Sequence, residues 1–170
     1  MFSPVWSSRR RAGAIELELG LTADHVYSLW TNINNSLLAV ADSIATDPPL
    51  RDQLMAVTPG RFKGKAPADV LERVNAYRLK LDRLRGLGVL GPTKLYNHGD
   101  FPVTPRIIYV NSGHVLNGQI ELLVNRTPPD LLISPFYVQY DFSGKSPDDN
   151  FTLIDLADRR LDLILGMTGL

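Results

Sequence analysis

The chain of 170 residues contains no cysteine, which excludes disulfide bonds, thiolate metal sites and a cysteine nucleophile. It has no net charge either, because 18 Lys and Arg residues balance 18 Asp and Glu residues. That balance argues against a dedicated binder of polyanions, and we do not expect nucleic acid as a partner. A chain without cysteine suits reducing and oxidising compartments alike, so cytoplasmic, periplasmic and secreted locations all stay open.

Long apolar runs are also absent. The longest uncharged helical stretch, residues 26–41, contains Thr31, Ser36 and three asparagines, and it is too short and too polar to span a bilayer. The N-terminal segment MFSPVWSSRRRAGA has its arginines after the apolar residues, so it does not match a signal peptide. We therefore expect a soluble chain without a transmembrane segment, in which residues 1–13 are flexible.

Sequence motifs for catalysis and cofactor binding give little support to an enzyme. The three histidines form no HxH or HExxH metal motif, and no GxSxG nucleophile motif is present. GRFKGK, residues 60–65, lacks the spacing of a phosphate-binding loop, and we do not interpret LGVLG, residues 87–91, as a dinucleotide fingerprint. We predict no catalytic residue, no metal site and no cofactor.

What the chain does contain is a segment that recurs. KAPADVLERVNAYRLKLDRL, residues 65–84, resembles KSPDDNFTLIDLADRRLDLI, residues 145–164, when the two are aligned without gaps. The identical positions are Lys65 with Lys145, Pro67 with Pro147, Asp69 with Asp149, Leu81 with Leu161 and Asp82 with Asp162. Residues 23–40 and 104–122 follow the same pattern more loosely, and the latter interrupts its apolar stripe at Ser112 and Gln119.

The recurring segment has the features of a helix. Pro67, Pro105 and Pro147 each lie at a predicted helix start, where the missing N–H has no cost, and Thr104 and Ser146 are suitable N-caps. Acidic residues follow, where they oppose the positive end of the helix dipole. One apolar stripe per helix means one buried face per helix, which favours a four-helix bundle.

We therefore predict an all-α, four-helix bundle-like domain that covers residues 1–170 and is built from four helical units about 40 residues apart. The predicted units are residues 22–44, 66–86, 104–124 and 146–166. Their connections are longer than usual bundle loops and carry many apolar residues, so they should be ordered. We expect a short helix over residues 50–57 and extended backbone over 132–142, with a short β segment at 14–21 as a partner for it.

Two polar stripes mark the candidate binding site. The first helix carries a run of amides, and the third carries polar residues at helical spacing. Facing inward they would line a cleft for a small polar ligand, whereas facing outward they are ordinary solvated surface, which is the commoner arrangement. The candidate ligand-binding residues are Asn32, Asn35, Asn111, His114 and Asn117.

Two glycines in the third helix, Gly113 and Gly118, each cost roughly 1 kcal/mol relative to alanine. They predict either close backbone packing or a kink. Charge is also distributed unevenly, because residues 61–85 are basic and residues 121–162 acidic. Either the second and fourth helices are neighbours whose charges compensate, or the basic segment forms a face for an anionic partner.

The absence of motifs and the regular units favour a non-enzymatic helical scaffold or protein-interaction module, which works with a partner protein or by self-association. A small-ligand-binding or sensory bundle, with a polar cleft around the first and third helices, is the alternative from another functional class. An enzyme without a recognisable motif is the third.

Overall fold

The computed structural model describes residues 20–87, 90–126 and 136–169, and these residues form five helices and no strand. The helices are α2 (Ala23–Asp42), α3 (Leu50–Ala56), α4 (Pro67–Leu87), α5 (Pro105–Arg126) and α6 (Pro147–Thr168). The four long helices confirm the predicted units about 40 residues apart, and α3 confirms the short helix in the first connection. The structure is all-helical and bundle-like, as predicted.

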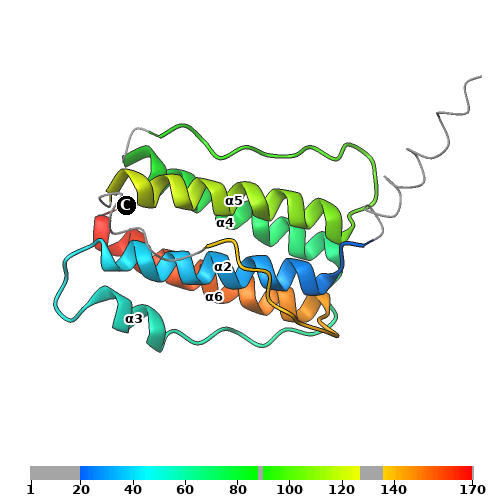
Figure 1. Cartoon of the computed structure of the whole chain (residues 1–170), viewed down its shortest axis with the longest axis horizontal. Coiled ribbons are helices and arrows are strands. Elements are labelled where there is room, and N and C mark those ends of the chain that lie inside the picture. The colour runs from blue at the N-terminus through cyan, green and yellow to red at the C-terminus, as the bar shows by residue number, and fades with distance from the viewer. Residues whose placement is uncertain (1–19, 88–89, 127–135, 170) are drawn as a thin grey trace, which may run out of the picture.

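All four long helices run in the same direction (Figure 1). Their first turns meet at one end of the bundle around a small space, which is lined by Ala23, Pro67, Pro105 and Pro147 among others. Neighbouring helices in a bundle are more often antiparallel and joined by short loops. Parallel neighbours require each connection to return along the whole bundle, which explains why the connections 43–66, 88–104 and 127–146 are long.

The four helices form a ring in which α2 and α4 each pack against both α5 and α6. Helices α2 and α4 therefore face each other across one diagonal, while α3 packs outside against α2 and α6. The apolar stripes fill the centre. The core side chains include Trp30, Ile33, Leu37, Val74, Tyr77, Leu81, Val115, Leu116, Leu122, Ile154, Leu161 and Ile164, all buried.

The two largest core side chains meet across the α2–α4 diagonal. Trp30 and Tyr77 pack edge to face, with ring centroids 5.1 Å apart and an interplanar angle of 86°. Both carry a polar atom, and α5 satisfies both: Trp30 Nε1 donates to Ser112 Oγ at 2.8 Å, and the Tyr77 hydroxyl donates to Gln119 Oε1 at 2.6 Å. The two interruptions of the apolar stripe on α5 are thus the hydrogen-bond partners of the central aromatic pair.

Gln119 also connects α5 to α2. Its Nε2 donates to the Ile33 carbonyl oxygen at 2.8 Å and to Ser36 Oγ at 2.6 Å, so both ends of this fully buried amide are used. Burial, and secondarily the nearby charge of Asp158, raises the pKa of Tyr77 well above its usual value. The phenol is therefore neutral and is available as a donor to Gln119.

Two similar turns lead into α4 and α6. Residues 62–65 and 142–145 both have the pattern F-x-G-K, and Gly64 and Gly144 have φ of 73° and 75°, a left-handed conformation that favours glycine. The correspondence between the two segments thus extends upstream of their helices. That the four units form a helical repeat stays a prediction.

Each of these turns docks on the first turn of a neighbouring helix. Lys65 N–H donates to Asp148 Oδ1 at 2.6 Å, and its ammonium lies 4.4 Å from the centroid of the Phe151 ring on α6. The corresponding contacts on α2 are those of Lys145 with Asp24 at 2.7 Å and with the Tyr27 ring at 4.3 Å. The start of α4 is therefore held against the start of α6, and the start of α6 against the start of α2.

Along the described segments, no helix has both the length and the apolar character needed to cross a membrane. Residues 1–13, most of the predicted β segment at 14–21, and residues 132–135 of the predicted extended stretch lie outside the described residues. The rest of that stretch, 136–142, belongs to no helix or strand. Organisation of the whole chain as one domain stays a prediction.

The buried Tyr77–Gln119 hydrogen bond can be tested with a double-mutant cycle. Gln119→Leu leaves the Tyr77 hydroxyl without its acceptor and should lower the free energy of unfolding by about 1–3 kcal/mol. The double variant Tyr77→Phe, Gln119→Leu should lose about 1 kcal/mol less than the sum of the single changes, because it leaves no orphaned hydroxyl. Urea denaturation of the four proteins gives the coupling energy.

The control for this cycle is Gln53→Leu on α3, whose Nε2 donates to the Pro48 carbonyl near the surface. It should change the free energy of unfolding by less than about 0.5 kcal/mol. Strict additivity of the two core substitutions would show that the two side chains are energetically independent.

Candidate functional site

The five predicted ligand-binding residues lie in three different places. Asn32 and Asn35 on α2 contact the connection 136–146, Asn111 on α5 contacts the connection 90–104, and His114 with Asn117 lines a separate pocket on α5. Ligand binding by any of them stays a prediction. Their present contacts show which of them have polar atoms to spare.

Asn32 holds the connection 136–146 against α2. Its Nδ2 donates to the Val138 carbonyl oxygen at 2.8 Å, and its Oδ1 accepts from the Val138 N–H at 3.2 Å. The other hydrogen on Nδ2 is donated to the Ser28 carbonyl oxygen, so every polar atom of the buried amide has a hydrogen-bond partner. Asn35, nearer the surface, donates from Nδ2 to the Tyr140 hydroxyl at 3.1 Å.

Asn111 makes the same kind of contact with the connection 90–104. Its Oδ1 accepts from the Tyr96 N–H at 2.9 Å, and its Nδ2 donates to the carbonyl oxygens of Tyr96 and Ile107. A carboxamide presents one acceptor beside one donor, as a peptide group does, so each asparagine replaces the strand that an extended segment would otherwise pair with. Asn32 and Asn111 therefore have no polar atom left for a ligand in this arrangement.

His114 and Asn117 line a pocket of about 250 Å³ between the end of α4, the start of the connection 90–104 and the middle of α5. We call it the polar pocket. Its lining residues are Arg85, Pro92, Thr93, Lys94, His114, Asn117, Gly118 and Glu121.

The wall of the polar pocket is a buried guanidinium group. Arg85 is only 4% exposed and donates to the carbonyl oxygens of Gly91, at 2.9 Å, and Gly118. It also forms an ion pair of 2.7 Å with Glu121, whose side chain is 60% exposed. These contacts offset the cost of burying a charge and fasten α4 to α5.

Gly118 allows this close approach. A Cβ atom at Gly118 would lie 2.8 Å from Thr93 Oγ1 and 3.3 Å from Arg85 Nη1, so a larger residue would push the connection away from α5. The predicted close packing is therefore confirmed at Gly118, whereas Gly113 has open space around it. Helix α5 continues through both glycines.

A second hollow, of about 510 Å³, lies where the connection 96–104 folds over the first turns of α5. We call it the apolar groove. Its lining residues are Tyr96, His98, Phe101, Pro102, Thr104, Arg106, Ile107 and Val110. Phe101 is 76% exposed and Tyr96 48% exposed, so two aromatic rings stand in solvent beside it.

The turn that presents Phe101 is closed by its own hydrogen bonds. Phe101 N–H donates to the His98 carbonyl oxygen at 3.3 Å, and His98 Nδ1 lies 2.8 Å from the Phe101 carbonyl oxygen. Gly99, with φ of 59°, donates from its N–H to Asn97 Oδ1 at 2.9 Å. Phe101 is not among the candidate residues predicted from the sequence. The available signal was an aromatic residue placed between glycine and proline in a turn.

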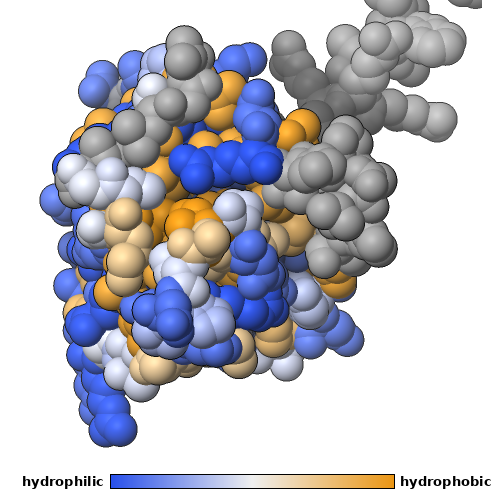
Figure 2. Space-filling view, turned by 90° about the vertical axis from the view of Figure 1, so that its left-hand side faces the viewer, coloured by the Kyte–Doolittle hydropathy of each residue, from blue (hydrophilic) through white to orange (hydrophobic). Residues whose placement is uncertain are grey.

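Figure 2 shows the opposite end of the bundle, where the helices finish, with apolar surface surrounded by hydrophilic residues. Val124 at the end of α5 and Met167 at the end of α6 are about half exposed there. Residues 127–135, which follow α5, and residue 170 lie outside the described residues. The apolar groove is therefore the better-defined apolar surface.

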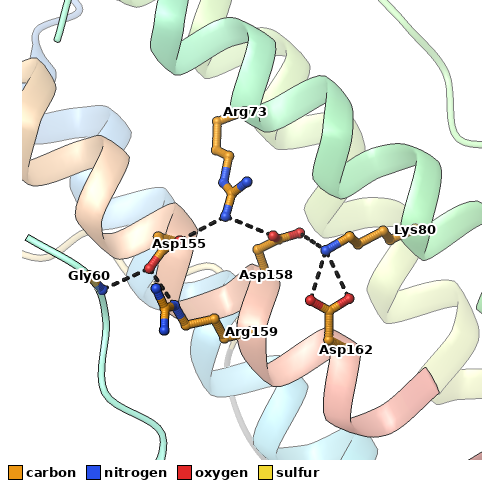
Figure 3. Close-up of polar contacts among 7 residues, drawn as sticks. All are labelled: Gly60, Arg73, Lys80, Asp155, Asp158, Arg159 and Asp162. Carbon is orange, nitrogen blue, oxygen red and sulfur yellow. Dashed lines mark hydrogen bonds and ion pairs between the residues drawn. The ribbon is translucent and has the colours of Figure 1, made fainter. Parts of the chain in front are cut away.

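The uneven charge along the sequence is explained by ion pairs between α4 and α6 (Figure 3). Arg73 lies 2.7 Å from Asp155 and 2.8 Å from Asp158, while Lys80 lies 2.9 Å from Asp158 and 2.8 Å from Asp162. The hypothesis that the second and fourth helices are neighbours with compensating charges is confirmed. These two cations are therefore occupied and do not form a free basic face.

Asp155 also holds the first connection. Its Oδ2 accepts from the Gly60 N–H and from Arg159 Nε, at 2.8 and 2.7 Å. Burial by itself would raise the pKa of this carboxyl, but the Gly60 hydrogen bond and the charges of Arg159 and Arg73 outweigh it and lower the pKa.

Among the described residues, no group of three His, Asp or Glu side chains is placed to hold a metal ion. Residues 86–91, with Gly86 included, spell GLGVLG and fit the letters G-x-G-x-x-G. A dinucleotide fingerprint joins a strand to a helix, whereas here Gly86 lies in the last turn of α4. The structural context of the fingerprint is therefore missing.

Comparison of the chain with models of protein families, with curated proteins and with solved structures found no significant match.

The Asn111 contact predicts the local stability of the connection 90–104. Asn111→Ala removes the partner of the Tyr96 peptide groups, so amides around residue 96 should exchange hydrogen about five- to 150-fold faster, corresponding to about 1–3 kcal/mol of opening free energy. Hydrogen exchange followed by mass spectrometry measures this. Asn125→Ala, on an exposed part of the same helix, should leave these amides unchanged. Unchanged exchange in Asn111→Ala would contradict the proposed role.

The lowered pKa of Asp155 predicts how stability depends on pH. The stabilisation is present above the unfolded-state pKa of about 3.9 and is lost as pH falls through the lower folded-state pKa. Asp155→Asn should therefore cost about 2 kcal/mol at pH 7, and this difference should shrink below about pH 4. Urea denaturation from pH 2 to 7 tests this, with Asp162→Asn, whose side chain is 54% exposed, as the smaller-effect control. A difference that stays constant over this range is the contrary result.

Proposed function

We propose that this protein is a non-enzymatic interaction module that binds an apolar segment of a partner protein in the apolar groove. The observation that carries the proposal is Phe101, an aromatic ring 76% exposed on a turn that hydrogen bonds hold closed. Exposed aromatic rings beside a hollow are typical of the centres of protein interfaces.

The other two connections supply an internal comparison. Phe62 and Phe142, which also precede a helix, pack on Phe151 and Tyr27, with ring centroids 4.7 and 4.9 Å apart. Phe101 precedes α5 at nearly the same distance along the chain but turns its ring to solvent. The chain therefore packs this aromatic ring against a helix in two connections and exposes it in the third.

The groove also has suitable dimensions and rigidity. A volume of about 510 Å³ is enough for two or three apolar side chains, and Ile107 at its base is largely buried in the bundle. Asn111 fixes Tyr96 on one side, and the closed turn fixes Phe101 on the other. Binding would thus require little ordering of the module itself, which favours affinity.

Phe101→Ser and Tyr96→Ser should weaken binding of the partner at least tenfold, because each removes an anchor that binding would bury. A photocrosslinking amino acid at position 101 identifies the partner, and titration of the purified partner by calorimetry measures the affinity. Light scattering of the protein alone tests whether the partner is a second copy.

Leu79→Ser is the matched control, since Leu79 is 58% exposed on α4 and does not line the groove. It should leave the affinity unchanged. Equal weakening by Leu79→Ser, or a crosslinked partner whose purified form binds independently of Phe101, would overturn the proposal.

A further inference from the structure

The polar pocket contains more hydrogen-bond donors than its own acceptors can use. Lys94 and His114 line it, and neither makes a hydrogen bond or ion pair with any described residue. Asn117 uses only its Oδ1, which accepts from the Tyr137 hydroxyl, so both Nδ2 hydrogens are unused. Lys94, His114 and Asn117 thus each present to the polar pocket an N–H group without an acceptor among the residues described.

The acceptors of the same pocket are largely occupied. Glu121 is its only carboxylate, and it is paired with Arg85 at 2.7 Å. The Gly118 carbonyl oxygen also accepts from Arg85. Since the Arg85–Glu121 pair is neutral as a whole, the ammonium of Lys94 leaves the pocket with an unbalanced positive charge.

A buried polar group without a described partner lies in the wall of the same pocket. The Thr93 hydroxyl has no hydrogen-bond partner in the described part of the chain, although the residue is 94% buried in the pocket wall. It is pressed against Gly118, the one position on α5 where a Cβ atom would exclude it. Buried hydroxyls usually find a partner, so its isolation here is unusual.

From this donor excess we propose that the polar pocket binds a small oxyanion, a carboxylate or a phosphate. Lys94, His114 and Asn117 donate to the anion from the open side, and the ammonium of Lys94 supplies the positive charge. A volume of about 250 Å³ fits a compact anion and is smaller than the sites of most drug-sized ligands. The ligand chemistry follows from the donors, because an oxyanion accepts several hydrogen bonds at once.

This site goes beyond the interaction proposed above and shares no residue with the apolar groove. The two proposals therefore fail independently. Loss of the Phe101-dependent interaction would leave anion binding intact, and loss of anion binding would leave the groove intact.

The test is a titration followed by NMR chemical shifts and calorimetry in a zwitterionic buffer of low ionic strength. Inorganic phosphate is one arm, and acetate and succinate are the other, so the arms distinguish the two sources of oxyanion. We expect saturable binding of one anion per chain in at least one arm, with shifts at Lys94, His114 and Asn117. Lys94→Gln and Asn117→Leu should each weaken it about tenfold, because each removes donors to a charged ligand.

The matched control is Lys63→Gln, which removes the same charge from an exposed position in another connection. It should leave the affinity within about twofold, because Lys63 does not line the polar pocket and so donates no hydrogen bond to the anion. Lys94 and Asn117 are exposed, so circular dichroism and the melting temperature should show that the variants fold. No saturable binding in either arm, or equal weakening by Lys63→Gln, would overturn the proposal.

Discussion

The parallel direction of the four long helices is the constraint on which the rest of the structure depends. A helix of 20 to 22 residues is about 30 Å long, and a chain that returns beside it needs roughly ten extended residues. Each connection must therefore cross the outside of the bundle beside helices, which offer its peptide groups no neighbouring strand as a hydrogen-bond partner. Those peptide groups still need partners, and side chains on the helices supply them.

Several polar residues on the helices are explained by this need. Asn32 pairs with Val138, Asn111 with Tyr96, and Asp155 with Gly60, one contact for each connection. The same direction of all four helices also aligns their dipoles, which is unfavourable. First-turn acids such as Asp24 and Asp148 oppose this, and they additionally accept the backbone N–H groups of the incoming turns. Ion pairs between α4 and α6 add attraction further along the bundle (Figure 3).

Helix number, position and burial were predictable from the sequence because they depend on local periodicity and on proline at helix starts. The direction of the helices was not predictable, since an apolar stripe has the same pattern in a parallel and an antiparallel bundle. Ser112 and Gln119 resembled defects because their partners, Trp30 and Tyr77, come from other helices. Asn32 and Asn111 were predicted to bind a small polar ligand, whereas in the structure they bind the backbone of a connection. The sequence alone did not distinguish a ligand from the backbone of a connection, because both offer the same donors and acceptors.

The connection 90–104 differs from the other two in a way that links both proposed sites. Residues 62–65 and 142–145 each end their connection in an F-x-G-K turn that docks on a neighbouring helix. No such turn precedes α5, and Phe101 and Lys94 of this connection are left facing solvent. Meanwhile Asn111, Gly118 and the carboxylate of Asp82, which accepts from the Thr93 N–H, hold its backbone close to α4 and α5. The segment is thus fixed in place while Phe101 and Lys94 stay exposed, and both proposed sites depend on this combination.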